Sequence, residues 1–275
     1  MVQYLVPGIC YHKEPSMDLP QNALVMKDET VDTLFGQKIS IIQGRSGYRF
    51  SVDSVLLAHF ARIKRHEQAI DLGAGNGIIT LLLTKLYPES MFCAVEIQDH
   101  LADQALRNSI INGVSRRMKV LHEDLHNLPR LLQPGSLNAV ISNPPYRPAH
   151  SGRINPNPCR AGARHEVFAS LESFISVAGI LLKNGGRAYF VLPSFRLAEL
   201  LPLLKKHRLE PKTLQLLYPY SWAESRHFLI EAYKNRQVGL RILPPLVLYR
   251  EKGIPSEEIE NIYRDFQEKL ECLRN

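Results

Sequence analysis

The chain has 275 residues, of which 45% are hydrophobic and 22% are charged, so it has the composition of an ordinary globular protein with a sizeable core. No apolar run is long enough to span a membrane, so we expect no membrane segment. The four widely spaced cysteines form neither a zinc-type cluster nor a disulfide framework, so we expect a cytoplasmic protein without a bound metal. The formal net charge of +7 makes nucleic acid the first candidate partner, although mild basicity is common among globular proteins.

The N-terminal part is expected to form an extension ahead of the main domain. The first thirty residues carry scattered prolines and little periodicity, and residues 31–42 alternate weakly, as one or two short strands would. After a turn, a helix is expected to begin near Asp53 or Ser54, since either residue can cap a helix N-terminus. Tyr48 and Phe50 lie just before this helix, where they could contact either the cofactor and substrate or the hydrophobic core.

The middle of the chain alternates short apolar runs with helical segments. Strands are expected at residues 68–72, 92–96, 118–121 and 137–142. Helices are expected at residues 78–87 and 99–112. Strands that alternate with helices in this way are typical of a parallel, doubly wound α/β sheet.

The C-terminal half continues this pattern less regularly. Helices are expected at residues 166–182, 194–207 and 259–273. Strands are expected at residues 187–192, 214–218, 228–234 and 244–249, with the second and third as a hairpin-like pair. Gly185 and Gly186 are expected to separate the first of these helices from the strand that follows it.

A glycine-rich turn, Asp71-Leu72-Gly73-Ala74-Gly75-Asn76-Gly77, follows the first of the middle strands and opens a helix. A dinucleotide-binding fingerprint would place its third glycine one position later, where this chain has Ile78. The three glycines therefore bring bare backbone close to a ligand without seating a pyrophosphate. The Asp71 carboxylate would repel a pyrophosphate and attract an ammonium group. Taken alone, the turn leaves a dehydrogenase-type site open.

Acidic residues stand at the ends of the next two strands. Glu96 lies about where an acidic residue holds a ribose diol in dinucleotide-binding folds, and Asp124 is placed to accept a hydrogen bond from an adenine amino group. Each could instead be a solvated residue at a strand end. A ligand with an ammonium group, a ribose and an adenine but no phosphates fits these features, and S-adenosylmethionine (SAM) is such a ligand.

The strand at 137–142 runs into Asn143-Pro144-Pro145-Tyr146. Neither proline can donate a backbone hydrogen bond, so the strand must stop there, and the following proline holds Asn143 in extended geometry. This predicts a stiff platform at the carboxyl end of a strand, where open α/β sheets bind ligands. The Asn143 side-chain oxygen and the Pro144 carbonyl could each accept a hydrogen from a nucleobase amine, and Tyr146 could stack on that base. Alone, the motif could also be a simple loop breaker.

A polar loop follows the platform and is rich in arginine. Its arginines could hold phosphates around an adenosine that is flipped into the site, or the loop could simply be solvated. These candidate substrate-binding residues are Arg147, Arg153, Arg160 and Arg164.

In this order, the glycine-rich turn, the two strand-end acids and the platform resemble the class I, Rossmann-like SAM-dependent methyltransferases, and Asn-Pro-Pro-Tyr resembles their amino-methylating branch. The segments at 47–53, 152–166 and 244–249 resemble the bacterial tRNA(Val) adenine-N(6)-methyltransferases. The resemblance implies a Rossmann-like, seven-stranded sheet, mostly parallel with an antiparallel closing strand, plus a short N-terminal extension. It also implies three parts: an N-terminal arm at 1–52, a methyltransferase domain at 53–252 and a charged C-terminal helix at 253–275.

The resemblance further implies a role for each motif residue. Asn143 and Pro144 would orient the target amine, Pro145 would complete the catalytic platform, and Tyr146 would stack on the base. The cofactor would be SAM, with S-adenosylhomocysteine as the product and no metal. The residues around it would be Asp71, Gly73, Gly75, Gly77, Glu96, Asp124 and Asn143.

The expected function is therefore methylation of the exocyclic amino group of adenine in RNA, and specifically in tRNA of the tRNA(Val) type. Three alternatives stay open: glutamine methylation of translation release factors, guanine amine methylation in ribosomal RNA, and a noncatalytic relative that binds SAM and RNA. The short, extended segment before the catalytic region speaks against the first, because enzymes of that type usually carry a helical substrate domain there. The oligomeric state is not predicted.

Overall fold

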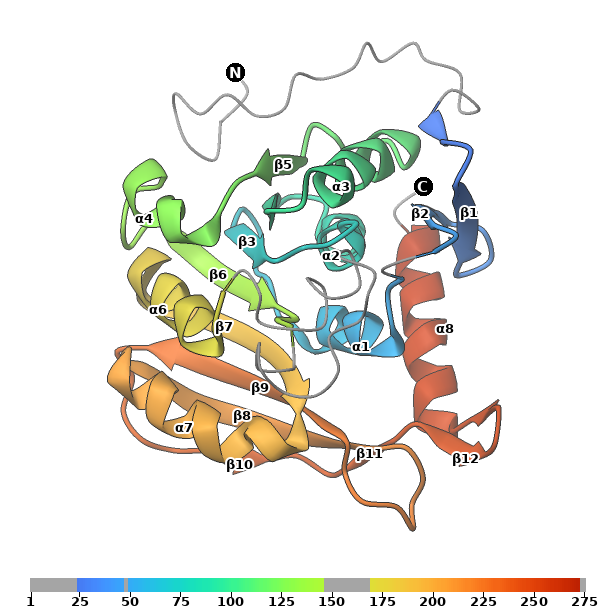
Figure 1. Cartoon of the computed structure of the whole chain (residues 1–275). Coiled ribbons are helices and arrows are strands. Elements are labelled where there is room, and N and C mark those ends of the chain that lie inside the picture. Colours follow the sequence, from blue (N-terminus) through green and yellow to red (C-terminus); the bar gives the residue numbers. More distant parts are fainter. Residues whose placement is uncertain (1–23, 47–48, 146–168, 273–275) are drawn as a thin grey trace.

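The structure is a computed structural model, which describes residues 24–46, 49–145 and 169–272. Its centre is a sheet with the strand order β10-β8-β9-β7-β6-β3-β4-β5, and β11 pairs separately with β8 (Figure 1). The strands are β3 (Gln68–Leu72), β4 (Met91–Glu96), β5 (Met118–His122), β6 (Leu137–Ser142), β7 (Leu182–Pro193), β8 (Leu209–Tyr218), β9 (His227–Lys234), β10 (Arg241–Ile242) and β11 (Leu246–Val247).

The pairing confirms the predicted α/β class. Strands β5, β4, β3, β6 and β7 are parallel to one another, and β9 runs antiparallel to both β7 and β8. Seven strands therefore form the expected mostly parallel sheet with an antiparallel strand near its edge. The two-residue strands β10 and β11 extend it beyond β8, to which both are parallel.

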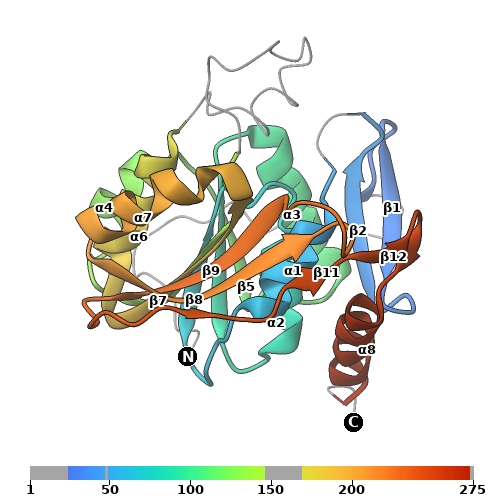
Figure 2. The same ribbon diagram turned by 90° about the horizontal axis from the view of Figure 1, so that it is seen from below.

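Helices cover both faces of the sheet, as Figure 2 shows. One face carries α1 (Val52–Phe60), α2 (Ile78–Leu86) and α3 (Asp99–Ile111). The other carries α4 (Leu128–Leu131), α6 (Leu171–Leu181) and α7 (Leu197–Lys206). Because strand side chains alternate between the faces, Tyr189 belongs to the first core and its neighbour Phe190 to the second. Both faces are buried, which explains why the parallel strands are continuous apolar runs.

The N-terminal hairpin and the C-terminal helix pack side by side on the first face (Figure 2). The hairpin consists of β1 (Glu29–Leu34) and β2 (Ile39–Gly44), which pair over their full length, and the helix is α8 (Glu257–Cys272). The Phe35 ring at the hairpin turn stacks on Phe266 of α8 with centroids 4.8 Å apart. A small hairpin of β12 (Tyr249–Glu251) and β13 (Ile254–Pro255) precedes α8. The division at residues 52 and 252 stays a prediction.

Several predicted boundaries were wrong for identifiable reasons. Ala169 and Ser170 are not helical, because the Ser170 hydroxyl caps α6 by accepting from the Ser173 amide. Gly185 and Gly186 lie inside β7 rather than before it, and β6 and β7 shift register opposite this part of the strand. The N-cap of α1 is Ser51, which precedes the predicted cap residues Asp53 and Ser54 by two and three residues.

Two further segments differ from expectation. The helix expected at 194–207 begins as a 3-10 turn, η3 (Ser194–Arg196), before α7. The strand expected at 244–249 is reduced to β11 and the start of β12, since Pro244 and Pro245 have no N–H to donate to a ladder. Residues 1–23 and 166–168 of the predicted arm and helix lie outside the described residues.

Candidate active site

A pocket lies at the carboxyl edge of the sheet, where the parallel strands β3, β4, β5 and β6 all end. Each strand contributes the residues that directly follow it, so segments far apart in the sequence meet there. The predicted site residues that line the pocket are Gly73, Gly75, Glu96, Asp124, Asn143 and Pro145.

The glycine-rich turn forms one wall, and its backbone geometry requires glycine at two points. Gly77 has φ +81°, and a Cβ there would lie 2.7 Å from Met118 Cε and 2.9 Å from Ala105 Cβ. It therefore lets α2 start close to α3 and does not line the pocket. Gly73 has φ +69°, and a Cβ there would lie 3.2 Å from the Phe174 ring, which lines the pocket from α6.

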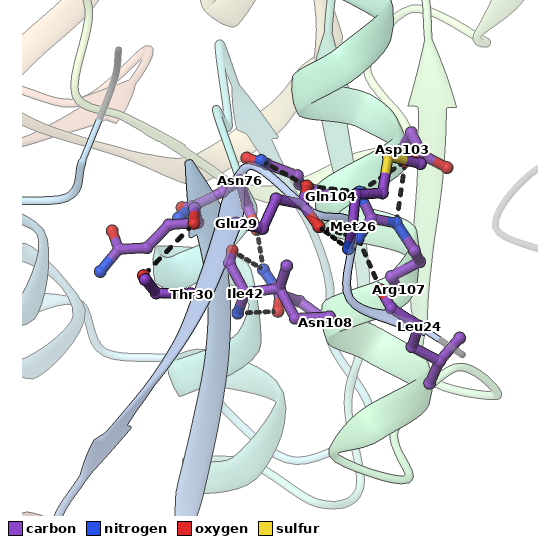
Figure 3. Close-up of polar contacts among 11 residues, drawn as sticks. Leu24, Met26, Glu29, Thr30, Ile42, Asn76, Asp103, Gln104, Arg107 and Asn108 are labelled. Atoms are coloured by element: carbon purple, nitrogen blue, oxygen red, sulfur yellow. Dashed lines mark hydrogen bonds and ion pairs between the residues drawn. The ribbon is translucent and has the colours of Figure 1, made fainter. Parts of the chain in front are cut away.

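Hydrogen bonds hold this turn in place from both sides. The Gly73 and Ala74 amides both donate to the Val95 carbonyl at 2.9 Å. The Asn76 carbonyl accepts from Asn108 Nδ2 of α3 at 2.9 Å, a contact drawn in Figure 3. The turn is thus shaped before any ligand arrives.

Glu96 is buried at the end of β4 and borders the pocket. Its Oε2 accepts from the Gly75 amide at 2.8 Å, and its Oε1 accepts from the Gln98 amide at 2.9 Å. Burial raises the pKa of this carboxyl, while the backbone hydrogen bonds oppose the rise. The carboxylate is therefore fixed in orientation with oxygens directed at the turn and the pocket wall.

Asp71 lies beneath the turn and is not among the residues that line the pocket. Its Oδ2 accepts from the Thr80 hydroxyl at 2.8 Å, but its buried Oδ1 has no hydrogen-bond partner among the described residues. Burial raises the pKa of Asp71 to about 7, hydrogen bonds from Thr80 oppose the rise, and the nearby Glu96 charge adds to it. Two buried carboxyls that raise each other's energy when both are charged favour a ligand that carries positive charge.

The platform stands at the end of β6. Ser142 Oγ donates to the Leu72 carbonyl at 2.7 Å, which ties the ends of β6 and β3 together. Asn143 Nδ2 donates to Ser54 Oγ of α1 at 3.4 Å, whereas its buried Oδ1 has no partner among the described residues. Pro145 lines the pocket, whereas Pro144 is buried and is not among the lining residues. Asn143 therefore lines the pocket with an acceptor oxygen that has no partner among the described residues.

The end of β5 is more polar than predicted. Asp124 lines the pocket, but its Oδ1 caps the short helix η2 (Leu125–Asn127) by accepting from the His126 amide at 2.9 Å. Glu123 also lines the pocket, and its Oε1 accepts from the Asp124 amide at 2.8 Å. The sequence predicts no role for Glu123, although its place beside a strand-end acid is a usable signal.

The remaining predicted residues divide into two groups. Phe50 is partly buried and packs against the core around α1, as its alternative interpretation expected. The others lie outside the described residues: Tyr48, Tyr146, Arg147, Arg153, Arg160 and Arg164.

Further lining residues were not predicted. Ile97 and Gln98 directly follow Glu96, so the strand-to-helix turn was a usable signal for them. Ala169 and Phe174 come from the α6 region and carry no local signal, because only the tertiary fold brings them to the pocket.

Two absences apply to the described ranges alone. Within them, no cluster of three or more His, Cys, Asp or Glu side chains is arranged to hold a metal ion. Nor does any helix there have both the length and the apolar character needed to cross a membrane.

Comparison with known sequences gives consistent matches. The model of the family described as "Methyltransferase small domain" matches residues 51–207. A protein of Aliivibrio salmonicida named tRNA1(Val) (adenine(37)-N6)-methyltransferase is 30% identical over 165 residues, which are 60% of this chain and 68% of that protein. A Pedobacter heparinus protein of the same name is 28% identical over 231 residues, or 84% of this chain and 95% of that one.

Solved structures show the same fold. An Agrobacterium tumefaciens protein described as a predicted O-methyltransferase superposes with a TM-score of 0.63 at 20% identity, covering 78% of this chain and 96% of that one. A Thermus thermophilus 16S rRNA N2 G1207 methyltransferase, solved with AdoMet and guanosine, gives a TM-score of 0.53 at 20% identity. The match covers 75% of this chain and 50% of that one. At these identities the likeness concerns the fold alone.

Proposed function

The chain belongs to the methyltransferase small domain family, and from this premise we propose that it transfers a methyl group from SAM to the exocyclic amino group of an adenine in tRNA. The relatives named as tRNA1(Val) adenine-N6-methyltransferases support this substrate, and one of them matches over 84% of this chain. The net charge of +7 agrees with a nucleic-acid partner.

The observation that carries the proposal is the state of the Asn143 amide. Asn143 lines the pocket, its buried Oδ1 has no hydrogen-bond partner among the described residues, and its Nδ2 donates to Ser54 Oγ. A lone acceptor at this place suits a ligand that donates a hydrogen, as an exocyclic amine does. A carbon acceptor of a methyl group has no polar hydrogen to donate and would leave this oxygen without a partner.

The residues present also fit SAM. The unpaired Asp71 oxygen and the raised pKa values of Asp71 and Glu96 favour a cationic ligand, and a Cβ at Gly73 would crowd the Phe174 ring at 3.2 Å. We assign Asp71 and the glycine turn to the methionine side and Glu96 to the ribose hydroxyls. We assign Asp124 to the adenine.

When bound, SAM would supply a methyl group attached to a positively charged sulfur. The chain's own residues would orient the amine. Asn143 Oδ1 and the Pro144 carbonyl would each accept a hydrogen bond from one of its N–H groups, which turns the nitrogen lone pair out of conjugation with the ring. Both acceptors sit on a segment stiffened by two prolines, so little reorganisation is needed. The methylated nitrogen would then lose its extra proton to water, and S-adenosylhomocysteine would be the other product.

The deciding experiment identifies the methylated residue. The protein is incubated with methyl-labelled SAM and, separately, with total tRNA, ribosomal RNA, DNA and a translation release factor, and the products are digested and identified. We expect labelled N6-methyladenosine from tRNA. Methylated guanine from ribosomal RNA or methylglutamine from the release factor would replace the proposal with one of its alternatives.

A further inference from the structure

The loop between β8 and β9 carries an aromatic pair that the proposed active site does not use. The rings of Tyr220 and Trp222 stack with centroids 5.0 Å apart and an interplanar angle of 9°. Trp222 nevertheless keeps 73% of its surface exposed, which is unusual for the largest apolar side chain. Among the exposed large hydrophobic residues of the described chain, only Trp222 and Phe195 are aromatic.

Both exposed aromatic residues lie on the same edge of the sheet as the pocket. Strand β9 is antiparallel to both β7 and β8, so β7 and β8 run in the same direction. Because β7 is also parallel to β6, strands β6, β7 and β8 all end at this edge. Asn143 follows β6, Phe195 follows β7, and Trp222 follows β8, whose loop lies next to β11 in Figure 1. Three strand spacings separate β6 from β8, or about 14 Å across the sheet. A few nucleotides of RNA span such a distance, at a rise of about 3.4 Å per stacked nucleotide.

The loop is anchored on both sides, so the rings are held in place. Towards β7, Ser225 Oγ lies 2.8 Å from Ser194 Oγ, and the Ser194 amide donates to the Arg226 carbonyl at 2.9 Å. Towards β12, the Tyr249 amide donates to the Pro219 carbonyl at 3.0 Å, and its ring lies 6.0 Å from that of Tyr220. A loop that is fixed at both ends loses less conformational entropy on binding, which favours affinity.

We propose that the Tyr220–Trp222 pair is a second base-binding surface, on which a nucleotide near the target adenine stacks while that adenine occupies the pocket. The inference rests on the proposed RNA methylation and names a further contact of the same substrate. Single-stranded RNA is commonly bound by exposed aromatic rings beside cationic side chains, and the exposed Arg226 follows the pair in this loop. Glu224 carries the opposite charge in the same loop, so the stacking surface and not the loop's net charge provides the attraction.

A second copy of the chain is the competing occupant. Two rings offer far less apolar area than a stable dimer interface buries, and the other exposed large hydrophobic residues include Leu131, Ile180 and Val238 on other elements. A contact with one base matches the size of this surface better.

Trp222 is the only tryptophan in the chain, so its fluorescence reports on this surface alone. We expect saturable quenching when tRNA is added, with the same Kd as an independent filter-binding measurement, and no change with SAM alone. Fluorescence that stays constant at saturating tRNA overturns the proposal. So does a spectrum that changes with protein concentration in the absence of RNA, because the pair would then contact a second copy.

Variants give an independent readout. Trp222→Ala should raise the KM for tRNA roughly tenfold, since stacking on an aromatic side chain is worth about 1–3 kcal/mol per base, and should leave the SAM Kd and kcat within about twofold. Trp222→Phe should restore most of the affinity. Val238→Ala, an exposed residue in the β9–β10 loop at the opposite edge, is the matched control. If the wild type methylates tRNA and Trp222→Ala has the same KM for tRNA, the stacking surface is contradicted but the proposed function is not. If the wild type methylates no tRNA, the proposed function is contradicted.

Discussion

The side-chain amide of Asn143 has its two ends in different surroundings. Nδ2 donates to Ser54 Oγ, while the buried Oδ1 has no partner among the described residues. A buried acceptor without a hydrogen bond costs roughly 1–3 kcal/mol of folding stability, and a ligand that donates to it removes this cost. Such an arrangement is typical of a binding atom, because a purely structural amide would be satisfied at both ends.

Replacing this amide should separate catalysis from cofactor binding. In Asn143→Ala we expect kcat on tRNA to fall by roughly 10²–10³, the usual effect of removing one preorganised contact, while the SAM Kd from calorimetry stays within a few-fold. Ser54→Ala should lower kcat by roughly tenfold, since the amide can then rotate. Asn184→Ala, on the exposed part of β7, is the matched control. Near-normal turnover in Asn143→Ala would falsify the orienting role.

Asp71 should make SAM binding depend on pH. Burial raises its pKa to about 7 in the free protein, hydrogen bonds from Thr80 oppose this rise, and a cationic ligand favours the ionised form. Binding should therefore release a proton, and SAM affinity should increase roughly five- to tenfold as the pH rises from about 6 to about 7.5. Calorimetry in buffers of different ionisation enthalpy measures the released proton. In Asp71→Asn, the pH dependence of SAM affinity that remains comes from the ligand's own ammonium group. If the pH dependence is the same in this variant as in the wild type, Asp71 is not its cause.

At the scale of elements, α3 completes the outer edge of β2. Asn108 accepts from the Ile42 amide at 2.6 Å and donates to its carbonyl at 3.0 Å, and Asn112 does the same for Ser40 at 3.0 and 2.6 Å. Four residues of a helix rise about 6 Å and two residues of a strand about 6.6 Å, so the two asparagines match alternate residues of the strand. The β1–β2 hairpin is thereby fixed to the helix that also supports the glycine turn.

The two asparagines should differ in their effects. Asn108→Ala removes a partner from both backbone groups of Ile42 and from the Asn76 carbonyl, so we expect a loss of about 2–4 kcal/mol in the free energy of unfolding measured with urea. It should also weaken SAM binding, since Asn76 belongs to the glycine turn. Asn112→Ala, which is partly buried and does not contact that turn, should cost about 1 kcal/mol and leave the SAM Kd unchanged. Equal effects of the two variants on SAM binding would contradict this coupling.

Elements with local signals were predictable from the sequence, and those shaped by distant contacts were not. The strand at 68–72 and the helix at 78–86 were confirmed within a residue, because an apolar run there meets glycine or proline at its boundaries. The start of α6 was wrong, since the cap at Ser170 outweighs the helical pattern before it. In the site, the residues after strands were predictable, whereas Phe174 reaches the pocket only through the packing of α6.

At the scale of the whole molecule, an ion pair ties the start of the described chain to its middle. Arg107 of α3 makes a bidentate pair with Glu29 of β1 at 2.6 and 2.8 Å, and both side chains are buried (Figure 3). Gln104 and the Met26 amide also donate to Glu29 at 2.8 Å. A buried carboxylate held by four donors is unlike a surface pair, so its removal should be measurable in the stability of the entire protein.

The pH dependence of unfolding should therefore carry the signature of Glu29. Burial alone would raise its pKa, but the hydrogen bonds from Arg107, Met26 and Gln104 lower it from 4.5 to about 2. Because the folded pKa is depressed, this group's contribution of about 3 kcal/mol is complete above about pH 4.5 and is lost as the pH falls towards 2. Urea unfolding of wild type and Glu29→Gln should show a stability difference that shrinks by about 2 kcal/mol between about pH 5 and about pH 3. A difference that stays constant over this interval would show that Glu29 titrates normally in the folded protein, and the pair would then contribute no more than a surface contact.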